Sequence, residues 1–112
     1  MNVNFNGYNE NVITFIADKS LTKAGVPVKI SGNGTVAPCT ASDSKLCGVC
    51  VNVRDGYATV QLSGYVRMPF TGNAAVGFQN IKPADGGKVT IGAGGRECLV
   101  TDFDSQHIGF IL

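Results

Sequence analysis

Alternation of apolar and polar residues is the main pattern along the chain, and it is clearest between residues 47 and 69. Two alternating runs here flank Asp55-Gly56, a pair that supplies the positive φ angles of a two-residue type I′ turn. Folding the chain about this pair predicts a β-hairpin with one apolar face. The predicted cross-strand pairs are Arg54–Tyr57, Val53–Ala58, Val51–Val60 and Val49–Leu62. The opposite face would hold polar side chains together with Cys50, and a slip of one residue would place valines in water.

Short stretches of the same kind follow one another along the rest of the chain, separated by glycine-rich turns. Besides the hairpin, the predicted strands are 11–17, 25–31, 35–39, 65–70, 78–82, 88–91, 98–103 and 107–112. We expect residues 11–17 to be buried on both faces near their middle. Pro27 cannot donate to a ladder, so we expect it on an edge strand or with its nitrogen facing outward. No segment shows a convincing period of 3.6 residues. The sequence therefore predicts an all-β protein, a small barrel or sandwich of about eight short antiparallel strands.

The two halves of the chain share one plan. In each half a strand, a glycine turn and a second strand precede an apolar segment that contains a glycine. The matching segments are 25–30 with 77–81, 34–36 with 87–89, and 46–51 with 107–112. This pseudo-repeat predicts a pseudo-symmetric barrel made of two halves. It also places Cys47 and Cys50 where the second half has Ile108 and Ile111, which are expected core positions.

With 44% hydrophobic and 15% charged residues, the 112-residue chain has the composition of one globular domain. We place this single β domain at residues 12–112. Residues 1–11 form an extended, Asn-rich N-terminal arm that carries Val3, Phe5 and Tyr8. Two interpretations of the arm stay open, a frayed terminus or a segment that orders on a partner surface. Under the second interpretation, these three side chains are the partner contacts.

The charge distribution argues against several classes of partner. The net charge is +1 and the nine Lys and Arg residues are scattered singly, so there is no electrostatic basis for binding a phosphate backbone. The nearest approach to a platform for single-stranded nucleic acid is a thin set of four residues: Arg54, Tyr57, Tyr65 and Arg67. No apolar run is long enough to span a bilayer, and the first residues lack the pattern of a signal peptide. We expect no nucleic-acid or membrane partner, and synthesis and use without secretion.

The four cysteines are Cys39, Cys47, Cys50 and Cys98. Cys47 and Cys50 have the spacing of zinc ligands, but residues three apart on a strand point to opposite faces. No second CxxC pair or His pair completes a ligand set. Because disulfides are rare in the cytosol, we expect the cysteines to be buried as small hydrophobic residues, with no metal or cofactor bound.

Few residues offer catalytic chemistry. The only histidine, His107, starts a predicted strand and has no recognisable nucleophile beside it. Asp102 and Asp104 share a strand face, where they could bind a cation or act as an acid–base pair, or they lie on a solvated edge near a turn. Residues 92–95 lack the helix and the Lys-Ser/Thr of a phosphate-binding loop, so we expect a hinge or hairpin loop. We expect no enzymatic activity and assign no catalytic residue.

The order of glycines and strands resembles that of the decoration or cement proteins of tailed-phage and prophage heads. The likeness covers residues 24–112 and consists of glycine-punctuated strand pairs, the Asp-Gly hairpin and a terminal x-Gly-x-x-Leu segment. The matching residues of this chain are 25–30, 34–36, 48–49, 55–56, 60–66 and 109–112. The four cysteines and the Asn-rich arm are not part of the pattern.

The resemblance implies a structural bacteriophage protein without enzymatic activity. Such a protein is made in the cytoplasm of the bacterial host. In the virion it binds the outer surface of the assembled capsid, on the lattice of the major capsid protein, and stabilises it, commonly as a homotrimer. Two alternatives stay open: another phage structural or adaptor barrel, such as a tail or baseplate component, and a small nucleic-acid- or ligand-binding β-barrel.

Overall fold

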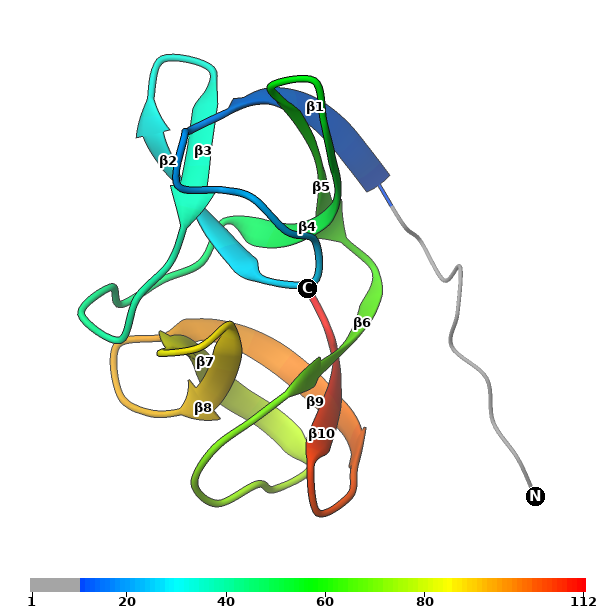
Figure 1. The fold of residues 1–112 in the computed structure, drawn as a ribbon. Helices are drawn as coiled ribbons and strands as arrows, with labels where there is room; N and C mark the ends of the chain where they lie inside the picture. The colour runs from blue at the N-terminus through cyan, green and yellow to red at the C-terminus, as the bar shows by residue number, and fades with distance from the viewer. Residues whose placement is uncertain (1–10) are drawn as a thin grey trace.

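The computed structural model describes residues 11–112, whose strands form two units, one after the other along the chain (Figure 1). The strands of the first unit are β1 (Asn11–Ala17), β2 (Pro27–Gly32), β3 (Thr35–Pro38), β4 (Gly48–Arg54) and β5 (Tyr57–Ser63). Those of the second unit are β6 (Tyr65–Pro69), β7 (Gly77–Ala84), β8 (Lys88–Ile91), β9 (Arg96–Phe103) and β10 (His107–Ile111). With 61% strand and no helix in the described part, the prediction of an all-β protein is confirmed. Residues 11–112 accordingly contain no helix that could span a membrane.

The strands of the two units are hydrogen-bonded to one another in the same order. The first unit closes into a barrel in the order β1-β3-β2-β4-β5, with β5 returning to β1. The second unit is a five-stranded sheet in the order β6-β10-β9-β7-β8, and a bridge between Phe70 and Val89 brings its two edge strands together. In each unit the first strand thus meets the third in parallel and the fifth antiparallel. The two-half plan corresponds to two units in succession, and not to one barrel divided in half.

Backbone hydrogen bonds recur at equivalent places in the two units. The amide of Asp18 donates to the carbonyl of Val36 at 2.8 Å, and the amide of Thr71 donates to the carbonyl of Val89 at 3.0 Å. Both bonds join the segment just after the first strand of a unit to its third strand. The first part of the predicted repeat is therefore a repeat of structure.

The last part of the predicted repeat is wrong. Residues 46–51 and 107–112 match in sequence, but they belong to β4 and β10, the fourth strand of one unit and the fifth of the other. The counterpart of β4 is β9. Cys50 and Cys98 occupy the third position of these two strands, and both are buried. Short apolar segments with a glycine look alike wherever they lie in the fold, so their similarity did not identify equivalent strands.

The hairpin of β4 and β5 turns where the sequence predicts. Asp55 and Gly56 have φ angles of +52° and +80°, the positive values that a type I′ turn requires. The predicted pairs Arg54–Tyr57 and Val53–Ala58 are confirmed. The turn chemistry therefore sets the register of the half of the hairpin that lies next to it.

A β-bulge changes the register in the other half of this hairpin. Cys50 pairs with Val60, so the predicted pairs Val51–Val60 and Val49–Leu62 are wrong. The extra residue turns Cys50 into the core, where it is fully buried, and leaves Val51 45% exposed. Cys50 therefore does not lie on the polar face that the simple alternation predicts.

Strand β4 separates two hydrophobic cores. The core of the first unit is formed by Leu21, Val26, Val28, Val36, Cys50, Ala58 and Val60. The second core is formed by Cys39, Leu46, Val49, Val66, Met68, Ile81, Val89, Cys98, Val100, Ile108 and Phe110. Three members of the second core, Cys39, Leu46 and Val49, come from the first half of the chain. The second sheet is thus covered by side chains of the first unit.

One prediction about a single strand is also wrong, and one of two alternatives for another strand is excluded. Residues 11–17 are not buried on both faces, because Val12 and Ile13 are 53% and 50% exposed. Pro27 is not on an edge strand, because β2 lies between β3 and β4. It is tolerated there as the first residue of its strand, where no ladder bond from its nitrogen is needed.

Polar side chains fix the junction between the units at Gly64, whose φ is +96°. The side-chain amide of Gln61, which is 6% exposed, donates to the carbonyl of Tyr65 at 3.0 Å. Arg96 of β9 reaches back to the first half and donates to the carbonyl of Cys47 at 2.8 Å. The relative position of the two units is therefore set by buried or half-buried hydrogen bonds as well as by the shared core.

Candidate functional site

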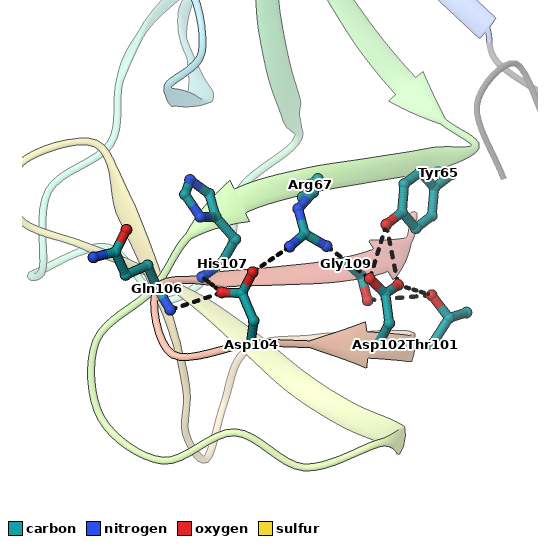
Figure 2. A network of polar contacts seen from close by, with 8 residues as sticks. All are labelled: Tyr65, Arg67, Thr101, Asp102, Asp104, Gln106, His107 and Gly109. Atoms are coloured by element: carbon teal, nitrogen blue, oxygen red, sulfur yellow. Dashed lines mark hydrogen bonds and ion pairs between the residues drawn. The ribbon is translucent and has the colours of Figure 1, made fainter. Parts of the chain in front are cut away.

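Adjacent strands β6, β10 and β9 hold a network of polar side chains on the outer face of the second sheet (Figure 2). Arg67, Gly109 and Asp102 lie opposite one another in the registers of these strands. The Arg67 guanidinium donates to Asp102 Oδ2 at 2.7 Å and to Asp104 Oδ2 at 2.6 Å. Tyr65, two residues before Arg67 on the same face of β6, donates its hydroxyl to Asp102 Oδ1 at 3.0 Å. We call Tyr65, Arg67, Asp102 and Asp104 the polar network.

Gly109 makes room for this network because it has no side chain. A Cβ atom at this position would overlap with the Tyr65 hydroxyl and with Asp102 Oδ1. Burial, and with it the nearby Asp102 carboxylate, raises the pKa of Tyr65, so the phenol keeps the proton that it donates. Sequence reasoning missed Gly109, although a glycine inside a strand is itself a sign of close approach by another group.

Asp104 also closes the turn between β9 and β10. Its Oδ1 accepts the backbone amides of Gln106 and His107, both at 2.8 Å. These two hydrogen bonds, assisted by the charge of Arg67, lower the pKa of the Asp104 carboxyl. His107 takes part through its backbone, and its imidazole points away from the Asp104 carboxylate in Figure 2.

The geometry favours a structural role for Asp102 and Asp104. Arg67 binds both carboxylates, and Asp102 Oδ1 also accepts the hydroxyl of Thr101 at 2.7 Å. A cation site or an acid–base pair needs carboxylate oxygens that are not already occupied in this way. Within residues 11–112, no group of three His, Cys, Asp or Glu side chains is placed to hold a metal ion. The polar network therefore fixes the shape of this face.

Apolar side chains cross the same face of the sheet next to the polar network. The strand registers align Phe78 with Leu99, Leu99 with Ile111, and Ile111 with Tyr65. We call these four residues the apolar row. Tyr65 belongs to both sets, because its ring ends the row and its hydroxyl joins the polar network. Phe78, at its outer end, is 71% exposed, more than any other large apolar side chain of the described part. Leu99, Ile111 and Tyr65 are partly buried. Apolar surface that continues from an exposed aromatic residue is typical of interaction sites.

The sequence did not reveal the apolar row because its members come from four strands. Phe78 and Tyr65 belong to one row only through the strand order β7-β9-β10-β6. Each residue alone looks like an ordinary member of an alternating strand. The row becomes visible once the registers are known.

The cysteines lie in or beside the two cores. Cys39, Cys50 and Cys98 are buried, as predicted for small hydrophobic residues, and Cys47 is partly buried. Burial raises the pKa of all four thiols, that of Cys39 to about 12. The thiolate is the reactive and metal-binding form, so these surroundings disfavour both roles.

The predicted aromatic and basic residues do not form a single platform. Arg54 and Tyr57 flank the turn of the first unit, whereas Tyr65 and Arg67 lie on the second sheet. Arg67 is paired with two carboxylates, so its charge is compensated. A surface for single-stranded nucleic acid needs aromatic side chains beside positive charge that is available to phosphates.

Two further expectations concern segments away from this face. The predicted partner contacts Val3, Phe5 and Tyr8 lie outside the described residues. Residues 92–95 join β8 to β9, which both pair with β7, so this loop crosses the end of β7 and is not a hairpin loop. No helix follows it, as expected for a segment that is not a phosphate-binding loop.

Comparison with known proteins gives no relatives. No protein-family model matches the chain, and no curated protein or solved structure is found to be similar to it. The likeness to phage head decoration proteins is therefore a likeness of pattern alone.

Proposed function

We propose that the protein is a structural component of a tailed-phage virion that binds the outer surface of the assembled capsid and stabilises it. Its partner is the lattice of the major capsid protein, and it catalyses no reaction. The order of glycines and strands motivates this class of protein. The apolar row on the outer face of the second sheet supports a role in binding another protein surface.

The main support is the apolar row beside the polar network. Apolar side chains that are exposed in the free protein gain free energy when a partner removes them from water. The neighbouring polar groups are already held by one another, so their ordering on binding has little entropic cost. A face with this combination suits a lasting contact with another protein surface.

The remaining features fit a lattice of many copies. A net charge of +1 allows copies to sit close together without strong repulsion. Contacts of the arm through Val3, Phe5 and Tyr8, and self-association as a trimer, belong to the same proposal. Many identical sites on one shell give avidity, so each contact can be modest. Binding to the expanded shell alone would stabilise that shell by mass action.

Co-sedimentation with the cognate expanded capsids tests the proposal. We expect the wild-type chain to pellet with capsids and to stay in the supernatant without them. Phe78→Ser removes the exposed end of the apolar row and should lower the apparent affinity about tenfold. Tyr57→Ser is the matched control, because Tyr57 is a 57% exposed aromatic residue on the first unit. Failure of the wild type to pellet would contradict the function, and equal losses in both variants would contradict the assigned surface.

A further inference from the structure

Strand β1 is the least covered strand of the first barrel. Val12 and Ile16 point to its outer face and are 53% and 51% exposed. Ile13 points to the inner face, opposite the buried Val60, and is still 50% exposed. The equivalent strand of the second unit, β6, instead buries Val66 and Met68. Apolar side chains on both faces of β1 thus remain in contact with water.

The backbone of β1 also has an open edge. The strand pairs with β5 along its length, but it pairs with β3 only at Ile16 and Ala17. The Ala17 amide donates to Gly56 on the β5 side, and the Ile16 amide donates to Gly34 on the other side, both at 2.9 Å. Because amides alternate along a strand, those of Val12 and Thr14 face the same way as that of Ile16, beyond the reach of β3. Within residues 11–112, no backbone hydrogen bond is formed on the β3 side of β1 before Ile16.

This edge lacks the usual protection against pairing. Edge strands of soluble proteins are commonly blocked by a lysine, a proline or a bulge in mid strand. Strand β1 (NVITFIA) has no charged residue and no proline, and its register is irregular only between Asn11 and Val12. It also lies on the side of the first unit away from the second sheet (Figure 1). An uncharged, half-exposed strand with a free edge is a ready template for another strand.

We propose that two copies of the chain pair through the open edges of their β1 strands. The two strands run antiparallel across a two-fold axis at Ile13. Val12 then lies opposite Thr14 of the second copy, and the two residues exchange both backbone hydrogen bonds. The same exchange occurs on the other side of the axis. Ile13 meets Ile13 of the second copy and is removed from water.

A second copy is the occupant that fits this edge best. The outward amides, Val12 and Thr14, are placed symmetrically about Ile13, so an identical strand in the opposite direction meets every donor with an acceptor. The edge carries no charge that would repel its own copy. At Ile16 the backbone amide on this edge already donates to Gly34, so pairing with the second copy must stop there. The contact is therefore closed and yields a pair, and not a fibre. This inference is independent of the proposed capsid binding, which uses the second sheet.

Sedimentation velocity on the full chain over a range of concentrations tests the inference. In solution without capsids we expect a monomer–dimer equilibrium, whereas the trimer of the proposed function forms on the shell. Thr14→Pro removes the outward amide without breaking a bond to β5, and it should weaken dimerisation about tenfold or more. Thr14→Val keeps the amide and should dimerise like the wild type. The inference would be overturned if the wild type stayed a monomer at every concentration, or if Thr14→Pro dimerised as strongly as the wild type.

Hydrogen exchange on the wild-type chain provides a test that does not depend on the folding of a variant. The amides of Val12 and Thr14 should gain protection as protein concentration rises, while that of Ile16 stays protected throughout. Protection that is independent of concentration and is lost when residues 1–10 are removed would show that the chain covers its own edge, and would overturn the inference. No protection at any concentration would overturn it as well.

Discussion

The first unit and the second unit share a strand order, yet they differ in how their side chains are covered. The second core contains Phe110, Met68, Ile81 and Ile108, all essentially inaccessible to solvent. The first core is built mainly from valines and smaller residues. Side chains of the first unit complete the second core, whereas every described member of the first core belongs to the first unit. The same strand order thus gives a well-packed core in the second unit and a more exposed barrel in the first unit.

The first strands of the two units show the difference most clearly. Ile13 of β1 pairs with Val60, and Val66 of β6 pairs with the equivalent Phe110. Ile13 is 50% exposed, but Val66 is only 6% exposed. Equivalent neighbours within the sheet therefore do not decide burial. What decides it is the packing of Val49 and its neighbours from the first half against the second sheet.

The largest expected effect comes from truncating equivalent residues in the two cores. Phe110→Ala should lower the free energy of unfolding by about 3–5 kcal/mol, because a large cavity forms in the fuller core. Val60→Ala, at the equivalent position, should cost about 2 kcal/mol, since fewer buried atoms are lost. Urea unfolding of both variants gives the comparison. A larger loss for Val60→Ala would show that the first core is the main source of stability.

A smaller effect is expected at the glycine beneath the polar network. Gly109→Ala should cost about 2 kcal/mol, because the added methyl group displaces the Tyr65 hydroxyl and Asp102. The same change in a Tyr65→Ala background should cost less, since one of the two obstructing groups is gone. Thr59 is the equivalent residue in the first unit and already carries a side chain, so Thr59→Ala serves as the control and should have little effect. If Gly109→Ala lowers the free energy of unfolding as much in the Tyr65→Ala background as in the wild type, the glycine is not needed to make room for the polar network.

The smallest effect is the acid dependence of stability due to Asp104. Its pKa is lowered in the folded protein, chiefly by the amides of Gln106 and His107. Its contribution to stability is therefore complete above the ordinary Asp pKa of about 4 and is lost as the pH falls through the lower folded value. Thermal unfolding between neutral and strongly acidic pH should show a shallower acid decline for Asp104→Asn than for the wild type. Identical declines would mean that the turn hydrogen bonds do not stabilise the charged carboxylate.

The parts of the fold that depend on local chemistry were predictable from the sequence. Asp55-Gly56 fixed the hairpin turn, and Asn11–Ala17 and Lys88–Ile91 were predicted with the bounds that the structure has. The bulge at Val51 was not predictable, because alternation along β4 cannot show which valine is the extra residue. Val49 and Cys50 are neighbours in β4 and both are buried, in different cores, so hydrophobicity did not distinguish the two faces there either.

The candidate site was only partly predictable. Tyr65 and Arg67 were seen to share a face, and Asp102 and Asp104 were singled out, but nothing joined the two pairs. They lie 35 and 37 residues apart and meet only through the register of β6, β10 and β9. The exposure of β1 was missed for a related reason. An apolar segment predicts burial, but whether a neighbour covers it depends on contacts beyond its own hairpin.

Electron cryomicroscopy of cognate expanded capsids mixed with the purified chain tests the central claim most directly. We predict density for the protein on the outer surface of the shell, with Phe78 and the rest of the apolar row facing the capsid protein. Shells without added density, or copies bound with the outer face of the second sheet turned to solvent, would contradict it.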